Sequence, residues 1–512
     1  MVFRETGCRR IRRRPPFVHM TIRRARPRAS HPVRRHYGAA ISIAFGIFCF
    51  HAPPVMAQLA EAATPADMAG APPSSPGEMR QSEIRLPESE HARATLGRAL
   101  GDKGIYLSST TTAIGATIAS GGLKKGVYGV FQHTFGTDIE LEPLAGIPNT
   151  VVHFTVVKRY GESNNRAYHG SAYAGLAIAG PVKVTRLTEF SIDVSLFHDK
   201  LRLLGGRAPS ATEYGTSDLY CRFTAGICGH IAPYAWARNS NSGFWPLASW
   251  TARATLKPTP NSYVRVGLSD VNTTGYARAG FPWNGGWRTK DSIGTFIPVE
   301  VGYRSSFADD SHPRAFNVGG FFDTSPYDDP YFNTEGLSRT LFGGTPLRHK
   351  GRASVYAQAQ QMVWRPDRGS SRGAHLFGAT MMNVYGVGQT KLHFLAGVVA
   401  SGPFDARLND SFSLMAFTNI LDRRVRDDYQ ASLIKTGQSG TAPRRETVIE
   451  ANYSFGLSPG LQLRPFVQYI DNPDQIGFRP VVSSNRNALI VGTQFSASLA
   501  DVFGLPAFQR KR

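Results

Sequence analysis

No apolar run in this 512-residue chain approaches the roughly 18 residues that a membrane-spanning helix requires. Charged residues are also sparse, at 19% of the total, and cysteine occurs only four times. The sequence contains no H-E-x-x-H zinc motif and no phosphate-binding P-loop, and its 14 histidines are scattered without metal-ligand spacing. These absences argue against a helical membrane protein, a metalloprotease and a P-loop nucleotidase, and we expect neither a metal nor a cofactor.

The formal net charge of +21 is concentrated at the start of the chain. Residues 1–57 contain 12 basic residues and one acidic residue, whereas the remaining 455 residues carry 46 basic and 36 acidic residues without a basic run. A nucleic-acid-binding surface needs clustered positive charge, so this distribution argues against a nucleic-acid partner.

The first 57 residues show the features of a secretory signal in the expected order. A basic region closes at Arg34-Arg35, an apolar run covers residues 37–50, and small residues at Val55 and Ala57 provide a cleavage site. We therefore predict a signal peptide over residues 1–57. The alternative is a basic disordered arm on a cytosolic protein.

Three further segments are predicted around the main domain. If translation starts at Met20, residues 1–19 are a mis-annotated extension. Residues 58–100 begin Ala-, Pro- and Ser-rich and are predicted to form a flexible periplasmic lead with a short helix within residues 88–100. Residues 500–512 form a C-terminal tail.

Residues 101–499 consist of successive segments, each of about ten residues, that alternate between apolar and polar positions. In residues 447–455, for example, Ile449 and Ala451 fall on one face, and Glu450 and Asn452 fall on the other. Successive side chains of a strand point to opposite faces, so the pattern predicts an all-β domain whose strands each have an apolar and a polar side.

A soluble β-sandwich shows the same alternation, with its apolar side turned inward. Two features favour a transmembrane antiparallel β-barrel instead. The polar faces carry Gln, Asn, Ser, Arg and Tyr rather than the Lys and Glu of a solvated sheet, and the signal leads to a compartment bordered by a membrane that closed barrels span. Aromatic residues near predicted strand ends suit interfacial girdles: Tyr303, Tyr385, Tyr469 and Phe495.

The predicted connections differ in length. Residues 257–261 and 458–460 are tight turns of the periplasmic kind, whereas residues 207–250 and 269–296 are long and aromatic-rich. We expect the long connections to be extracellular or to fold inward. Three acidic pairs are interpreted as parts of solvated loops rather than catalytic or calcium sites: Asp309-Asp310, Asp328-Asp329 and Asp427-Asp428.

Two cysteines, Cys221 and Cys228, lie beyond the predicted signal. An isolated pair in an oxidising compartment favours a disulfide over free thiols or a metal site, for which only His230 is close in sequence.

Several passages, spread in order over most of residues 101–499, resemble the OprB-type family of carbohydrate-selective porins. None of them is specific alone, but together they are. They include L-T-E-F at 187–190, L-L-G-G-R at 203–207, T-S-D-L-Y-C at 216–221, Y-A-Q-A-Q-Q-M-V-W-R-P-D at 356–367, L-R-P at 463–465 and Q-Y-I-D-N-P at 468–473.

The resemblance implies a sixteen-stranded barrel, monomeric and surrounded by outer-membrane lipids, that passes glucose and related small sugars down a gradient. A monomer and a trimer share one strand pattern, so both remain open. The chain departs from many barrels by running past Leu499 rather than ending on an aromatic residue. Either Phe495 serves as the last girdle residue, or Phe503 and Phe508 serve in assembly.

A sugar presents hydroxyl groups and apolar C–H faces, so a selective channel needs hydrogen-bonding side chains and aromatic platforms. We predict that residues 206–250 fold into or over the channel, stiffened by a Cys221–Cys228 disulfide. The predicted sugar pathway comprises Glu189, Arg207, Glu213, Asp218, Tyr220, Trp236, Arg238, Trp245, Trp250, Arg265, Glu300, Arg304, Gln358, Gln360, Glu450 and Arg464.

Structural roles are open for several of these residues. Glu189 and Arg207 are equally consistent with an ion pair that braces the wall, and Trp245 and Trp250 with girdle or loop-core positions. The resemblance therefore implies a carbohydrate channel, and the lack of catalytic motifs argues against an enzyme. The alternatives are a non-selective general-diffusion porin, an outer-membrane enzyme and a soluble secreted β-protein.

Overall fold

The computed structural model describes residues 95–162, 165–171, 174–176, 178, 184–229, 236, 238–243, 245–273, 287–367, 369–475 and 487–508. The predicted signal peptide and nearly all of the predicted flexible lead lie outside these residues. Within them, sixteen antiparallel strands form a closed barrel in which each strand pairs with its neighbours in sequence and β1 closes the ring against β16. None of the helices in this part of the chain is long and apolar enough to cross a membrane.

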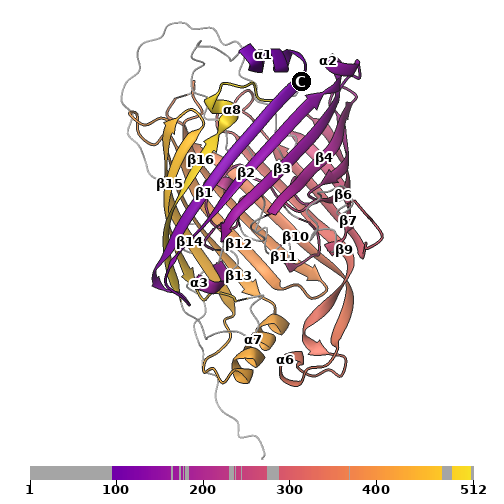
Figure 1. The fold of residues 1–512 in the computed structure, drawn as a ribbon, viewed down its shortest axis with the longest axis vertical. Coiled ribbons are helices and arrows are strands. Elements are labelled where there is room, and N and C mark those ends of the chain that lie inside the picture. The colour runs from indigo at the N-terminus through magenta and orange to yellow at the C-terminus, as the bar shows by residue number, and fades with distance from the viewer. Residues whose placement is uncertain are drawn as a thin grey trace, which may run out of the picture. The chain divides into compact units, whose positions relative to one another are not determined.

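The strands form the wall and the short helices lie at its ends or inside it (Figure 1). The strands are β1 (Ile105–Gly121), β2 (Val127–Glu140), β3 (Thr150–Glu162), β4 (Val184–Leu196), β5 (Leu201–Ala208), β6 (Ser249–Thr259), β7 (Ser262–Val271), β8 (Gly294–Arg304), β9 (Arg314–Asn333), β10 (Pro346–Trp364), β11 (Gly373–Tyr385), β12 (Thr390–Ser401), β13 (Ser411–Leu421), β14 (Arg445–Ser458), β15 (Leu461–Asp471) and β16 (Ala488–Ser498). The helices are α1 (Thr95–Asp102), α2 (Leu141–Ala145), α3 (Asn165–His169), η2 (Tyr220–Arg222), α6 (Arg339–Phe342), α7 (Arg423–Lys435) and α8 (Leu499–Val502).

The polar side of the strands faces the lumen and the apolar side faces outward, the reverse of a soluble sandwich. On β14, Glu450 is fully buried while the neighbouring Ile449 is 42% exposed. On β8, Glu300 is buried between the outward-facing Val299 and Val301. An apolar outer surface on a ring without free strand edges is what lipid requires. The predicted alternation and the barrel are confirmed, and the sandwich alternative is wrong.

The connections at the two ends of the barrel are unequal. At one end, here called the turn end, strands are joined by turns as short as residues 260–261 and 459–460, and α1 and α8 lie there (Figure 1). At the opposite loop end, connections run from residue 209 to 248 and from residue 272 to 293. This is the predicted asymmetry, although β6 continues through Pro258 and Thr259, so the first turn is shorter than expected.

The hairpin of β9 and β10 extends beyond the rest of the wall at the loop end, and α7 lies beside it (Figure 1). Asp329 of β9 accepts hydrogen bonds from its own strand and from His349 Nε2 at 2.8 Å, and forms an ion pair with Arg424 of α7. Asp428 of α7 accepts a hydrogen bond from Thr340 Oγ1 at 2.5 Å. The expectation of loops is therefore wrong for Asp328-Asp329 and Asp427-Asp428, which lie on a strand and a helix, whereas Asp309-Asp310 lie in the connection between β8 and β9, as predicted.

Both ends of the described chain meet at the turn end. The expected short helix is α1, which continues to Asp102, past the predicted end at residue 100. After β16 the tail folds back, so that Leu505 and Pro506 lie against α1 and the Phe508 ring is buried 5.3 Å from that of Tyr106 on β1. Phe495 is 37% exposed on the outer face of β16, as a girdle residue requires.

Candidate functional site

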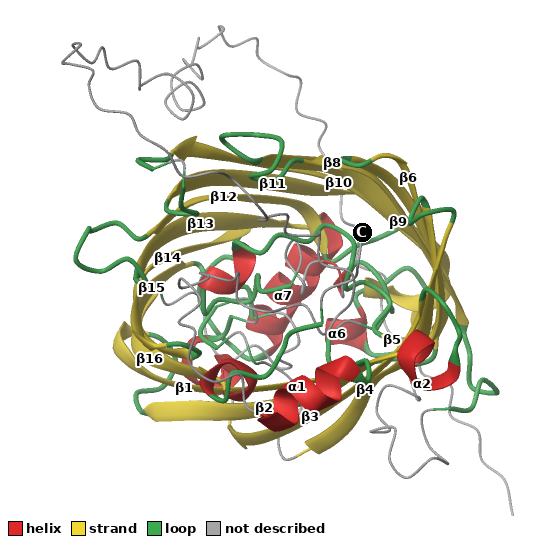
Figure 2. Ribbon diagram, turned by 90° about the horizontal axis from the view of Figure 1, so that it is seen from above, coloured by secondary structure: helices red, strands yellow, loops and turns green. Residues whose placement is uncertain are grey.

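The segment from Pro209 to Ala248, between β5 and β6, folds into the barrel and is here called the lumen loop. Figure 2, which looks along the barrel, shows that loops occupy the interior of the ring. Hydrogen bonds join described residues of the lumen loop to inward-facing side chains on opposite parts of the wall, from β6, β7, β8 and β10 to β14 and β15. This is the inward fold that the sequence predicts.

Glu450 of β14 holds the middle of the lumen loop. Its Oε1 and Oε2 accept hydrogen bonds from the backbone N–H groups of Thr224 and Ala225, each at 2.8 Å. The amides of Asn452 and Gln468 donate to the same carboxylate at 2.9 and 3.0 Å. With four donors and no exposed surface, Glu450 positions the loop and is not open to a passing solute.

Glu300 of β8 also accepts a backbone hydrogen bond from the lumen loop, on the other side of the lumen. Its Oε2 accepts the backbone N–H of Gly215 at 2.6 Å and the hydroxyl of Tyr356 at 2.8 Å, while Oε1 accepts the hydroxyl of Tyr263 at 2.7 Å. Arg265 Nη1 lies 3.5 Å from Oε1. The two glutamates therefore hold the lumen loop from opposite walls by its backbone.

Glu213 of the lumen loop forms ion pairs with three arginines from adjacent strands. Arg253 of β6 donates to its Oε1 at 2.5 Å, Arg265 of β7 lies 3.4 Å from Oε2, and Arg202 of β5 lies 3.8 Å from Oε1. Burial alone raises the pKa of Glu213, but the three guanidinium groups more than offset burial and hold this pKa below its ordinary value. The carboxylate of Glu213 is therefore charged, and its ion pairs fix the first part of the lumen loop to the wall.

Cys221 and Cys228 form a disulfide at the tip of the lumen loop, with an S–S distance of 2.03 Å and a Cα–Cα distance of 4.1 Å. Next to it, Arg464 of β15 donates from Nη1 to the carbonyl of Cys221 at 3.1 Å. The predicted pairing is confirmed, and the disulfide closes a short turn rather than joining the loop to the wall.

Replacing both cysteines by serine should loosen the tip without unfolding the barrel. Loss of the crosslink over so short a loop costs about 2 kcal/mol, which corresponds to about 30-fold faster opening. Hydrogen exchange at the amide of Ile227 should accelerate accordingly, while heat-modifiable migration on gels stays unchanged. A barrel that melts at a clearly lower temperature would contradict a role confined to the tip.

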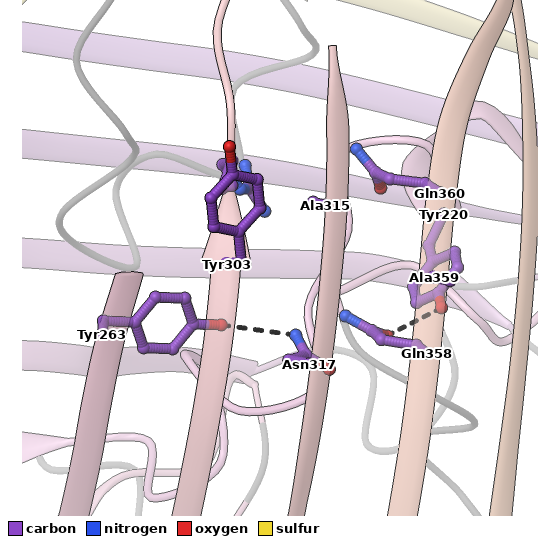
Figure 3. Close-up of a pocket in the computed structure, with 9 residues that line it drawn as sticks. Tyr220, Tyr263, Tyr303, Ala315, Asn317, Gln358, Ala359 and Gln360 are labelled. Carbon is purple, nitrogen blue, oxygen red and sulfur yellow. Dashed lines mark hydrogen bonds between the residues drawn. The ribbon is translucent and has the colours of Figure 1, made fainter. Parts of the chain in front are cut away.

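A pocket lies between the lumen loop and the wall formed by β7–β10 (Figure 3). Tyr220 donates its hydroxyl to Gln358 at 2.8 Å, and Ser217 donates to Gln360 at 2.5 Å. Arg304 Nη1 lies 3.3 Å from Asp218, and the side chains of this pair are 26% and 40% exposed. The polar lining consists of Tyr220, Tyr263, Tyr303, Arg304, Asn317, Gln358 and Gln360.

Asn317 of β9 presents a hydrogen-bond acceptor in this pocket. Its Nδ2 donates to the hydroxyl of Tyr263 at 3.4 Å, as drawn in Figure 3. Its Oδ1 is buried and has no hydrogen-bond partner among the described residues. Because a buried acceptor without a partner is costly, this atom is suited to a hydroxyl group of a solute or to water. Four of the residues assigned to the sugar pathway from sequence meet in this one pocket.

The predicted aromatic platforms lie elsewhere. Trp236 is fully buried against the rings of Phe321, Tyr356 and Phe296, at centroid distances of 4.8, 5.4 and 5.9 Å, so it anchors the lumen loop. Trp245 is half-buried where the loop returns to the wall. Because Trp236 has no exposed surface, its ring cannot serve as a platform for a sugar.

Arg207 and Trp250 do not face the lumen, contrary to the expectation for both. In the register of β4, β5 and β6, Arg207 stands opposite Phe190 and Trp250, which are each 39% exposed on the outer surface. There the guanidinium group lies 5.7 Å from the ring of Trp287, whose carbonyl accepts a hydrogen bond from Trp250 Nε1 at 3.0 Å. The ring of Trp287 thus covers Arg207 from outside.

Glu189 does face inward, and Ser191 Oγ donates to its Oε1 at 2.8 Å. It therefore lies on the face of the sheet opposite to Arg207, and the alternative of an ion pair between them is wrong. Arg238, farther along the lumen loop, pairs with Asp474 at 2.5 Å near the loop end. The sequence reasoning missed Tyr263, Asn317, Arg253 and Arg202, although each alternates with outward-facing apolar residues and was identifiable in that way.

Comparison with known proteins agrees with the barrel. A family model described as "Carbohydrate-selective porin, OprB family" matches residues 130–499. The chain belongs to this family. Porin B of Pseudomonas aeruginosa is 26% identical to the OprB-family porin described here over 383 residues, which cover 70% of this chain and 80% of that protein. The predicted family is thereby confirmed.

The high-pH structure of Pseudomonas putida OprB shares the fold of this porin. It superposes with a TM-score of 0.69 at 22% identity, covering 78% of this chain and 96% of that structure. Family and fold together make this porin a carbohydrate-selective channel of the bacterial outer membrane and not an enzyme.

Proposed function

We propose that this porin lets monosaccharides and small oligosaccharides, such as glucose, diffuse passively past the lumen loop, and that they make hydrogen bonds in the pocket of Figure 3. The observation that carries the proposal is the pocket itself. It combines amide, hydroxyl and guanidinium groups with the rings of Tyr220, Tyr263 and Tyr303, and it lies between the wall and a loop that is held from both sides of the barrel. Such groups match the alternating hydroxyl and C–H surfaces of a sugar ring.

Ten of the predicted pathway residues divide into two roles under this proposal. Asp218, Tyr220, Arg304, Gln358 and Gln360 contact the sugar, together with Asn317. Glu213, Glu300, Glu450, Arg265 and Trp236 hold the loop that shapes the path. Under this proposal each chain carries its own channel, whether the porin is a monomer or a trimer, and outer-membrane lipids lie against the apolar outer face.

Block of the ion current by sugar tests the pocket. In planar bilayers, glucose should reduce the current through the wild-type channel, and Asn317→Ala should raise the half-blocking glucose concentration about fivefold, because one hydrogen bond contributes about 1 kcal/mol. Gln494→Ala is the matched control, since Gln494 is a lumen-facing amide on β16 that bonds to Ser496. Equal block in wild type and Asn317→Ala would refute the assignment of the pocket.

A further inference from the structure

Arg464 of β15 is a buried cation with unused donors. Its side chain is among the largest fully buried ones, and within the part of the chain that the structure describes only Nη1 has a partner, the carbonyl of Cys221. Its Nε and Nη2 are buried without a hydrogen-bond partner among the described residues. A guanidinium group that loses its water without gaining hydrogen bonds is destabilising, so the two donors point to a missing acceptor.

A second arginine increases the positive charge at this place. Arg222, also buried, follows Cys221 directly on the lumen loop, and its carbonyl accepts a hydrogen bond from Asn452 Nδ2 at 2.9 Å. Its charge acts on Arg464 and on His375 of β11, whose Nδ1 is also buried without a partner among the described residues. The cluster therefore contains two guanidinium groups and an imidazole.

The acids near the cluster do not supply the missing acceptor. Glu450 acts electrostatically on Arg464, but its oxygens are occupied by two backbone and two amide donors. Asp218, which acts on Arg222, is in contact with Arg304. Among the described residues, two N–H groups of the Arg464 guanidinium thus remain unused, and a planar carboxylate matches the fork that they form.

The cluster adjoins the pocket across a single turn of the lumen loop. Helix η2 comprises Tyr220, Cys221 and Arg222. Tyr220 lines the pocket, Cys221 accepts from Arg464, and Arg222 belongs to the cluster. A solute with hydroxyl groups at one end and a carboxylate at the other therefore has partners on both sides of η2.

We propose that Arg464 and Arg222 form a carboxylate subsite beside the pocket, so that the porin takes up sugar acids as well as neutral sugars. A sugar acid is a sugar with one carbon oxidised to a carboxylate. Access to the subsite is through the partly exposed tip of the loop at Cys221, Cys228 and Gly229. This inference rests on the proposed function, because it extends the same pocket.

Current block by gluconate and by glucose distinguishes the two ligands in planar bilayers. Wild type should bind gluconate more tightly than glucose. Arg464→Gln should raise the half-blocking gluconate concentration about tenfold and leave that of glucose within about twofold. Arg423→Gln is the matched control, because Arg423 lies on α7 with an 88% exposed side chain and should change neither value.

Two further variants separate a carboxylate subsite from a role in holding the loop. Glu450→Gln loosens the same part of the loop but keeps both arginines and removes a negative charge that acts on Arg464, so the preference for gluconate should increase. Arg222→Gln removes the loop-borne cation and should weaken gluconate selectively even if Arg464→Gln fails to fold. Equal loss of glucose and gluconate block in the arginine variants, or no preference for gluconate in wild type, would overturn the subsite. A wild-type channel that neither sugar blocks would instead refute the proposed function.

Discussion

Replacing residues 210–247 of the lumen loop by a short Gly-Ser linker is expected to give a wide, unselective channel. Ala208 and Ser249 are paired in the β5–β6 ladder, so a linker of about four residues can close the hairpin. The wall consists of strand pairs that do not need the loop, and the barrel should still fold. A sixteen-stranded barrel without an inward loop contains an aqueous channel, so single-channel conductance should rise at least about threefold.

The same variant should lose discrimination by size. Liposomes containing it should swell in a trisaccharide nearly as fast as in glucose, whereas wild-type liposomes should swell mainly in the smaller sugar. Heat-modifiable migration on gels is the control for folding. A folded variant with wild-type conductance would show that the lumen loop does not limit the channel.

Glu450→Ala should release the lumen loop from the β14 wall. The change leaves the buried N–H groups of Thr224 and Ala225 without an acceptor. We expect a cost of about 3 kcal/mol, which shifts the ratio of docked to undocked loop about 150-fold. Hydrogen exchange at these two amides should accelerate by the same factor, and the single-channel current should fluctuate between a low and a high level.

Glu300→Ala provides the matched comparison for this prediction. It frees Gly215 at the other end of the loop and should therefore accelerate exchange at Gly215 but not at Thr224. Glu450→Gln should have a smaller effect than Glu450→Ala, because the amide oxygen still accepts one hydrogen bond. Unchanged exchange at Thr224 and Ala225 in Glu450→Ala would contradict the conclusion that Glu450 holds the lumen loop against β14.

The wall of the barrel could be predicted from sequence because successive side chains of a strand point to opposite faces, so apolar and polar residues alternate along it. The alternation alone assigned Glu300 and Glu450 to the lumen face, and both are there. It failed at Arg207, where Gly205 and Gly206 precede the arginine and provide no side chain to mark the face. There only the pairing with Phe190 shows the orientation.

The partners of the lumen residues could not be predicted. Glu450 meets the backbone of Thr224 and Ala225, which lie 226 and 225 residues earlier in the chain. Nothing in a local pattern indicates which backbone donors a carboxylate will meet across a barrel. Glu300 and Glu450 were therefore predicted to line the lumen, although they hold the loop. The free acceptor on Asn317 could be identified only from the structure of the pocket.

Helix α7 was missed for a different reason. Its charged sequence and its place between two strands suggested a loop, but Asp422 precedes it and accepts the backbone N–H of Arg424 at 2.9 Å, a regular helix N-cap. The cap was recognisable in the sequence. Its docking on the projecting hairpin through Asp329 was not.

Liposome swelling with a panel of small sugars and amino acids of similar size tests the central claim most directly. The claim is that the lumen loop makes this barrel selective for carbohydrates through hydrogen bonds in the pocket beside it. Wild-type liposomes should swell faster in the sugars than in the size-matched amino acids, and the loop-replacement variant should lose the difference. Equal rates for sugars and amino acids in the wild type would leave a pore but contradict its selectivity.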